Sequence, residues 1–145
     1  MDNYINFALN KLKEDGLKIT HPRQMIVKFL AKSQKVLSPY EMRDLLKKQK
    51  INADVVTIYR VLEVLEKMSL AHKVLAYNRY IRSKNKSEKT KSNCHHYFVC
   101  KQCGKVDEVE GEDLSALERK ITRTYKFQID SHYLEFLGLC AKCKK

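Results

Sequence analysis

Apolar residues in the first half of the chain recur three and four positions apart, the spacing that places side chains on one face of an α-helix. Four such groups are separated by polar stretches, so four helices are expected. In chain order, the apolar positions are Ile5, Ala8, Leu9 and Leu12; Met25, Ile26, Phe29 and Leu30; Met42, Leu45 and Leu46; and Val55, Ile58, Leu62 and Leu65.

Capping residues mark the helix boundaries in this half. Gly16 suits the end of the first helix. Ser38 and Glu41 flank Pro39 in the capping-box pattern, in which the hydroxyl and the carboxylate each satisfy a free backbone N–H group. Asp54 can cap the fourth helix.

Two short alternating runs follow, Leu70–Ala76 and Tyr77–Arg82, and this pattern favours a β-hairpin. Helices followed by a small hairpin are typical of a winged helix-turn-helix domain, here residues 1–82. Residues 83–93 contain no apolar side chain. They cannot bury any surface, so they are interpreted as a flexible basic linker.

The remaining segment, residues 94–145, mixes strand-like and helical patterns. The expected elements are strands at Tyr97–Cys100 and Lys105–Val109, a helix marked by Leu114, Leu117 and Ile121, and one or two strands within Phe127–Cys140. These elements predict a small α/β domain. The whole chain is therefore expected to be α+β, with a winged-helix domain before a second domain.

The net charge is +12, and its distribution favours a polyanionic partner. Residues 1–82 carry 16 Lys/Arg against 8 Asp/Glu, residues 83–93 carry 4 against 1, and residues 94–145 carry 9 against 8. A basic first half suits nucleic acid, because phosphate contacts release counterions. No apolar run is long enough for a membrane span, and the N-terminus lacks a secretory pattern. A cytoplasmic protein without membrane contact is expected.

Two Cys-x-x-Cys pairs, Cys100 with Cys103 and Cys140 with Cys143, supply four thiolates, the ligand set of structural zinc sites. In the reducing compartment expected for this chain, metal binding is favoured over disulfides. The 36 residues between the pairs exceed the spacing of a simple zinc ribbon. The fold must therefore bring the second pair back to the first.

A second group of side chains offers imidazole, thiolate and carboxylate, the usual ligands of first-row metals. Its members are His72, Cys94, His95, His96, Glu108, Glu110 and His132. If residues 94–100 are extended, Cys94 and His96 point to one face and His95 to the other. One site is then expected from His72, His95 and Glu108, and a second site from Cys94, His96 and His132. Cys94 could instead join the first site.

The helix after Asp54 has features of a DNA recognition helix. Its apolar stripe faces the core and leaves Thr57, Tyr59 and Arg60 available near the N-terminal end. A hydroxyl suits phosphate or thymine, and Arg suits guanine in the major groove of double-stranded DNA.

Four blocks of the sequence resemble the ferric uptake regulator family in order and spacing. They are Gly16–Arg23, Thr57–Leu62, His95–Val106 and His132–Cys143. The resemblance covers nearly the whole chain. It implies an N-terminal winged helix, a C-terminal dimerisation domain, and a homodimer that binds a palindromic operator and represses metal-uptake genes when its metal is bound.

The resemblance also implies roles for single residues. It places structural zinc on Cys100, Cys103, Cys140 and Cys143, an inter-domain sensory site on His72, His95 and Glu108, a further dimerisation-domain site on Cys94, His96 and His132, and DNA contacts on Lys18, Tyr59 and Arg60.

Two departures from iron-sensing members favour zinc as the sensed ion. Tyr97 stands where iron and peroxide sensors usually have a His, and Val36 stands where iron sensors have a His before the third helix. Cys94 adds a soft thiolate, which favours zinc. The alternative is an iron(II)-sensing or peroxide-sensing regulator of the same family, with iron(II) or manganese as the less favoured ion.

Two other classes fit the residues less well. An enzyme could use Cys94 with His95 or His96 as a nucleophile pair, or an open zinc site, but no Gly-rich loop or second catalytic block accompanies them. An RNA-binding zinc ribbon would need exposed aromatic side chains for base stacking. The sequence therefore predicts a DNA-binding regulator rather than an enzyme.

Overall fold

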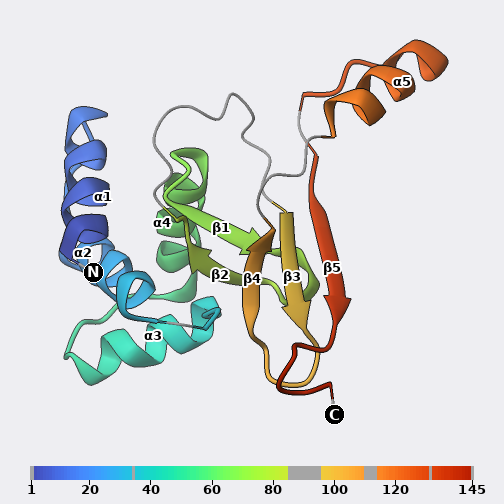
Figure 1. Ribbon diagram of the computed structural model, residues 1–145. Helices are drawn as coiled ribbons and strands as arrows, with labels where there is room; N and C mark the ends of the chain where they lie inside the picture. The colour runs from blue at the N-terminus through green and yellow to red at the C-terminus, as the bar shows by residue number, and fades with distance from the viewer. Residues whose placement is uncertain (1, 34, 85–95, 110–113, 131, 145) are drawn as a thin grey trace. The chain divides into compact units, whose positions relative to one another are not determined.

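The computed structural model describes residues 2–33, 35–84, 96–109, 114–130 and 132–144. The chain divides into two compact units, Met1–Ser87 and Glu88–Lys145, which are described separately below (Figure 1). Together they contain helices and two small sheets, which agrees with the expected α+β class. Among the described residues, no helix combines the length and the apolar character that crossing a bilayer requires.

Four helices build most of the first unit. They are α1 (Asp2–Glu14), α2 (His21–Lys32), α3 (Pro39–Lys48) and α4 (Val55–Lys67). The capping signals in the sequence form as expected. The hydroxyl of Ser38 accepts from the backbone N–H of Glu41 at 3.1 Å, and the Glu41 carboxylate accepts from the backbone N–H of Ser38 at 2.7 Å. At the start of α4, the Asp54 carboxylate accepts from the backbone N–H of Thr57 at 2.7 Å.

The apolar faces of these helices meet in one hydrophobic core. Its fully buried members include Leu12 from α1, Ile26 from α2, Leu46 from α3 and Leu62 from α4. Burying a side chain of this size contributes about 1.5–3 kcal/mol, so this shared core holds the helix arrangement together.

A short hairpin follows α4 and packs against the same core. Strand β1 (Ala71–Val74) pairs antiparallel with β2 (Arg79–Arg82). Leu37 extends the ladder, because it exchanges two backbone hydrogen bonds of 2.8 Å with Tyr80. The strands are shorter than the sequence predicts, because a 3₁₀ turn, η1 (Leu75–Tyr77), interrupts the hairpin.

The described residues of the second unit form a three-stranded sheet and one helix. Its elements are β3 (His96–Cys100), β4 (Val106–Val109), α5 (Ser115–Tyr125) and β5 (Leu134–Gly138). Strand β3 is central, antiparallel to β4 and parallel to β5. The expectation of one or two strands within residues 127–140 is met by one strand, β5, and the described residues between α5 and β5 form no ladder.

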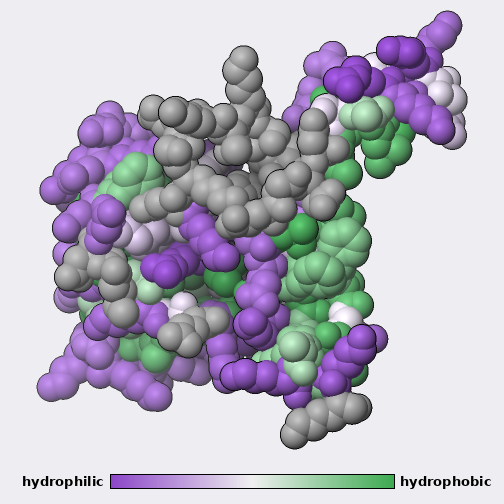
Figure 2. All heavy atoms as spheres, in the orientation of Figure 1, coloured by the Kyte–Doolittle hydropathy of each residue, from purple (hydrophilic) through white to green (hydrophobic). Residues whose placement is uncertain are grey.

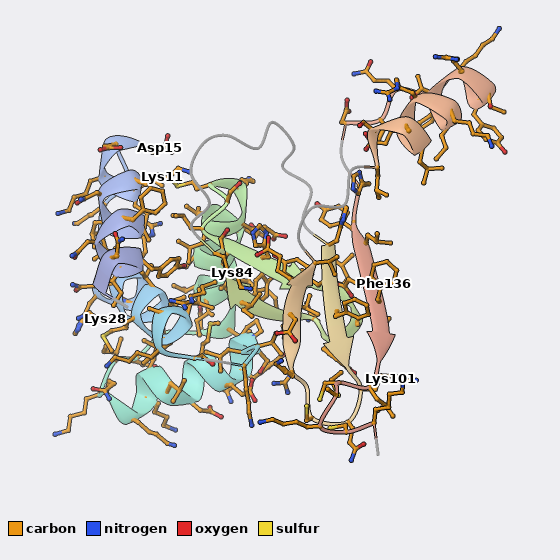
Figure 3. The ribbon with its side chains drawn as sticks, in the orientation of Figure 1. Lys11, Asp15, Lys28, Lys84, Lys101 and Phe136 are labelled. Atoms are coloured by element: carbon orange, nitrogen blue, oxygen red, sulfur yellow. The ribbon has the colours of Figure 1, made fainter. Side chains whose placement is uncertain are left out.

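Apolar side chains remain exposed on the second unit. Phe98 and Phe136 stack on neighbouring strands with ring centroids 5.1 Å apart, yet they are 54% and 42% exposed. Figure 2 shows apolar residues gathered along β5, and Phe136 projects from this strand in Figure 3. Helix α5 is amphipathic and has no buried residue.

Candidate metal centres and DNA-binding surface

The parallel pairing of β3 with β5 brings the two cysteine pairs together. Cys100 ends β3, and Cys140 follows β5 by two residues. The sulfur atoms of Cys100, Cys103, Cys140 and Cys143 all lie within 4.8 Å of one another. Four thiolates at this separation suit one tetrahedral zinc ion. Gly104, at φ 71°, takes the left-handed conformation that lets the first knuckle turn.

Backbone N–H groups donate hydrogen bonds to sulfur atoms of this cluster and favour the thiolate form that binds a cation. Hydrogen bonds from the backbone of Cys103 and Cys140 lower the pKa of the Cys100 thiol to about 6. Backbone and thiol hydrogen bonds from Cys143 also lower the pKa of Cys140. Cys143 shows the opposite effect, because hydrogen bonding to the neighbouring sulfurs raises its pKa to about 12. A bound divalent cation would stabilise all four cysteines as thiolates, because it would offset the negative charge on the neighbouring sulfurs.

A second cluster of ligand-type side chains lies in the same unit. The Nε2 atoms of His96, on β3, and His132, before β5, are 2.8 Å apart. His132 Nδ1 lies 2.6 Å from a carboxylate oxygen of Glu118, on α5. A carboxylate at one ring nitrogen fixes the orientation of the imidazole and directs the other nitrogen toward a metal. His96, His132 and Glu118 therefore have the chemistry of a metal site with a carboxylate support.

Sequence reasoning grouped His96 with His132 but missed Glu118. A signal was present: Glu118 follows Leu114 by four residues and precedes Ile121 by three, so it shares the apolar face of α5. A carboxylate among the apolar positions of an amphipathic helix is unusual, because charged side chains normally occupy the solvated face. Cys94, the third residue predicted for this cluster, lies outside the described residues.

The residues of the predicted sensory site fall in both units. His72 lies on β1, half-buried, with its Nε2 atom 3.0 Å from the Ser83 hydroxyl. Glu108 lies on β4 opposite Tyr97. His95 lies outside the described residues, so the structure does not describe this predicted set as a whole.

The expectation of zinc rather than iron depends on Val36 and Tyr97, and both side chains are buried. Val36, before α3, is 6% exposed, and Tyr97, on β3, is 7% exposed. Burial raises the pKa of the Tyr97 phenol well above its usual value, and the nearby Glu108 and Glu135 act in the same direction. Tyr97 is therefore a neutral core residue.

The predicted DNA contacts all lie in the first unit and are accessible. Thr57 and Arg60 are exposed on α4, and Tyr59 is half-buried there. Lys18 is exposed in the segment between α1 and α2, and its carbonyl accepts a hydrogen bond from the Arg23 guanidinium. Lysines also line the helices of this unit, including Lys11 and Lys28 (Figure 3).

Solved structures of known proteins share this fold. A structure described as a zinc uptake regulator complexed with zinc and DNA matches with a TM-score of 0.85 at 24% identity, covering 98% of this chain and 93% of that one. The holo form of XcZur matches with a TM-score of 0.80 at 23% identity, covering 99% and 98%. The Helicobacter pylori ferric uptake regulator matches with a TM-score of 0.61 at 23% identity, covering 99% and 93%.

Sequence comparison gives the family. The ferric uptake regulation protein of Bacillus subtilis (strain 168) is 31% identical over 144 residues, covering 99% of this chain and 96% of that protein. The peroxide-responsive repressor PerR of Staphylococcus saprophyticus is 28% identical over 144 residues, covering 99% and 94%. Residues 14–137 match the ferric uptake regulator family. The chain therefore belongs to this family of metal-responsive, DNA-binding transcription regulators, which are not enzymes.

Proposed function

We propose that this protein is a zinc-responsive transcriptional repressor that binds palindromic operator DNA as a homodimer and controls metal-uptake genes. The observation that carries the choice of zinc is the burial of Val36 and Tyr97 at the positions where iron sensors place histidines. Without those imidazoles, the N/O-rich coordination that suits iron(II) is incomplete. The Cys94 thiolate favours zinc further.

The comparisons support both zinc and iron. Two solved zinc uptake regulators have TM-scores of 0.85 and 0.80, whereas the curated relatives include ferric uptake regulation proteins and a peroxide-responsive repressor. The zinc proposal therefore rests on Val36, Tyr97 and Cys94, and iron(II) sensing is its alternative.

Three metal sites are proposed, each with its own role. The four-cysteine cluster would hold structural zinc, because its geometry suits that ion and lacks an open position for exchange. His72, His95 and Glu108 would bind the sensed ion. Cys94, His96 and His132, with Glu118 beside His132, would form the additional site.

The exposed apolar side chains of the second unit support a homodimer. Phe98 and Phe136 stack on neighbouring strands and leave apolar surface open, and the apolar residues of α5 are also unburied. Contiguous exposed apolar surface marks an interaction site. A second copy of this unit would cover it, and two winged helices would then face two half-sites of a palindrome.

The test of zinc sensing is a metal titration of the dimeric wild-type protein. Duplexes selected from a random pool by the protein, in parallel with zinc and with anaerobic iron(II), provide the probes, and fluorescence anisotropy reports their binding. Buffered zinc is expected to tighten DNA binding by about 5- to 150-fold, the range of typical allosteric coupling. Anaerobic iron(II) is expected to act more weakly at equal free-ion concentration. A response to iron(II) without a response to zinc would instead establish the alternative.

A second prediction concerns the proposed reading of DNA by α4. Arg60→Ala is expected to weaken binding to the selected duplex by about 1–3 kcal/mol and to relax its sequence preference, because Arg recognises guanine through two hydrogen bonds. Lys18→Ala should weaken binding to selected and random duplexes alike and reduce the slope with which affinity falls as salt rises. If Arg60→Ala keeps the preference of the wild type, α4 is not the reading element.

A further inference from the structure

The hairpin of β1 and β2, called the wing below, carries at its turn a side-chain contact to α4, the proposed recognition helix. Asn78 lies between η1 and β2 in the left-handed conformation, at φ 49° and ψ 45°. Its side-chain amide nitrogen donates to the phenol oxygen of Tyr59, on α4, at 3.1 Å. Both residues belong to the first unit. This hydrogen bond therefore ties the tip of the hairpin to one of the predicted DNA contacts.

The backbone alone gives one explanation for Asn at this position. Asn is among the few residues that adopt the left-handed conformation readily, and Gly does so at even less cost. If the turn were the only requirement, Gly would serve equally well. The contact with Tyr59 adds a requirement that Gly cannot meet, so the two explanations predict different results for one substitution.

The wing around Asn78 is held in place by independent contacts. The guanidinium of Arg79 donates to both carboxylate oxygens of Glu41, on α3, at 3.0 and 2.8 Å. Glu41 also accepts from the backbone N–H of Ser38. Tyr80 forms two backbone hydrogen bonds with Leu37. Because the chain beyond Asn78 is fixed in this way, its amide meets Tyr59 from a defined direction.

The direction of the hydrogen bond determines what Tyr59 can offer a ligand. A phenol has one O–H donor and an oxygen that accepts. The Asn78 amide occupies the accepting oxygen, so the phenol hydrogen remains available to donate. DNA presents acceptors to such a donor, because phosphate oxygens and most purine edge atoms of the major groove accept hydrogen bonds.

We propose that Asn78 is a positioning residue of the DNA-binding surface, which holds the Tyr59 phenol as a hydrogen-bond donor toward DNA. This inference rests on the proposed function, in which Tyr59 contacts DNA. It extends the DNA-binding surface from the recognition helix to the turn of the wing. Asn78 acts through Tyr59 and needs no contact of its own with DNA.

A double-mutant cycle tests the inference with four full-length, zinc-loaded proteins: wild type, Asn78→Gly, Tyr59→Phe, and the double variant. Gly keeps the left-handed turn and removes the amide, and Phe keeps the ring and removes the hydroxyl. The probes are a duplex selected by the wild type and a random duplex of equal length. Thermal unfolding and dimer mass confirm that each variant is folded.

Asn78→Gly is expected to weaken binding to the selected duplex by about 2- to 10-fold, the effect of one hydrogen bond. In the Tyr59→Phe background, the same substitution should have no further effect, because the hydroxyl on which it acts is gone. This dependence separates positioning from general damage to the wing, which would weaken DNA binding equally in both backgrounds.

Each remaining outcome overturns the inference in a recognisable way. Equal affinity of Asn78→Gly and wild type means that the turn alone explains Asn78. Additive losses mean that Asn78 acts independently of Tyr59. If Tyr59→Phe binds like the wild type while Arg60→Ala does not, the proposed function stands and the inference fails. If the zinc-loaded wild type selects no duplex, the proposed function itself fails.

Discussion

Replacing Cys100 with Ser is expected to remove zinc from the four-cysteine cluster and to unfold the second unit. A structural zinc ion contributes about 10 kcal/mol or more to folding in small sites. The second unit has little else to replace it: among its described residues, only His96, Tyr97, Val99, Cys100 and Val106 are buried. Three short strands with so small a core rarely fold without a metal or a partner surface.

Metal analysis, circular dichroism and dimer mass provide the readout for Cys100→Ser and, in parallel, Cys140→Ser. Both variants should lose one zinc equivalent per chain, lose the signal of the second unit and aggregate or dissociate. Lys142→Ser is the matched control, since Lys142 is exposed between two of the cysteines and offers no thiolate. A folded, dimeric and fully zinc-loaded Cys100→Ser protein would show that this cluster is not a structural zinc site.

The helices of the first unit could be predicted from the sequence because their signals are local. Ser38 and Asp54 accept from backbone N–H groups only three residues ahead, so the pattern alone specifies the contact. The wing was harder to predict, because its turn depends on the left-handed conformation of Asn78 and on pairing with Leu37. Neither feature is visible in an alternation of apolar residues.

The candidate sites divide in the same way. The Cys-x-x-Cys spacing identifies the four thiolates as one set, although it does not show that β3 and β5 pair in parallel to unite them. Glu118 could not be grouped with His132 from strand alternation, because a helix supplies it. Which side chains approach one imidazole is decided by tertiary packing, and sequence spacing does not encode that arrangement.

Replacing His72 with Ala is expected to remove most of the zinc dependence of DNA binding while keeping the fold, the dimer and the structural zinc. In the proposal, His72 from the first unit shares the sensed ion with His95 and Glu108 from the second. Such an ion binds more tightly when its ligands are brought together, so it increases the population of that state. Reciprocity requires that operator DNA tighten zinc binding by the same factor, about 5- to 150-fold.

The comparison uses wild type, His72→Ala and His21→Ala, each titrated with buffered zinc in the presence of the selected duplex. His21 is the matched control, because it is an exposed histidine of the first unit that belongs to neither proposed sensory set. Because His72→Ala also removes the hydrogen bond to Ser83, thermal unfolding measures whether the variant has lost stability. His21→Ala should keep the ratio of zinc-bound to zinc-free affinity, whereas His72→Ala should bring that ratio close to one. An unchanged ratio in His72→Ala would exclude His72 from the sensory site, and the response would then be assigned to Cys94, His96 and His132.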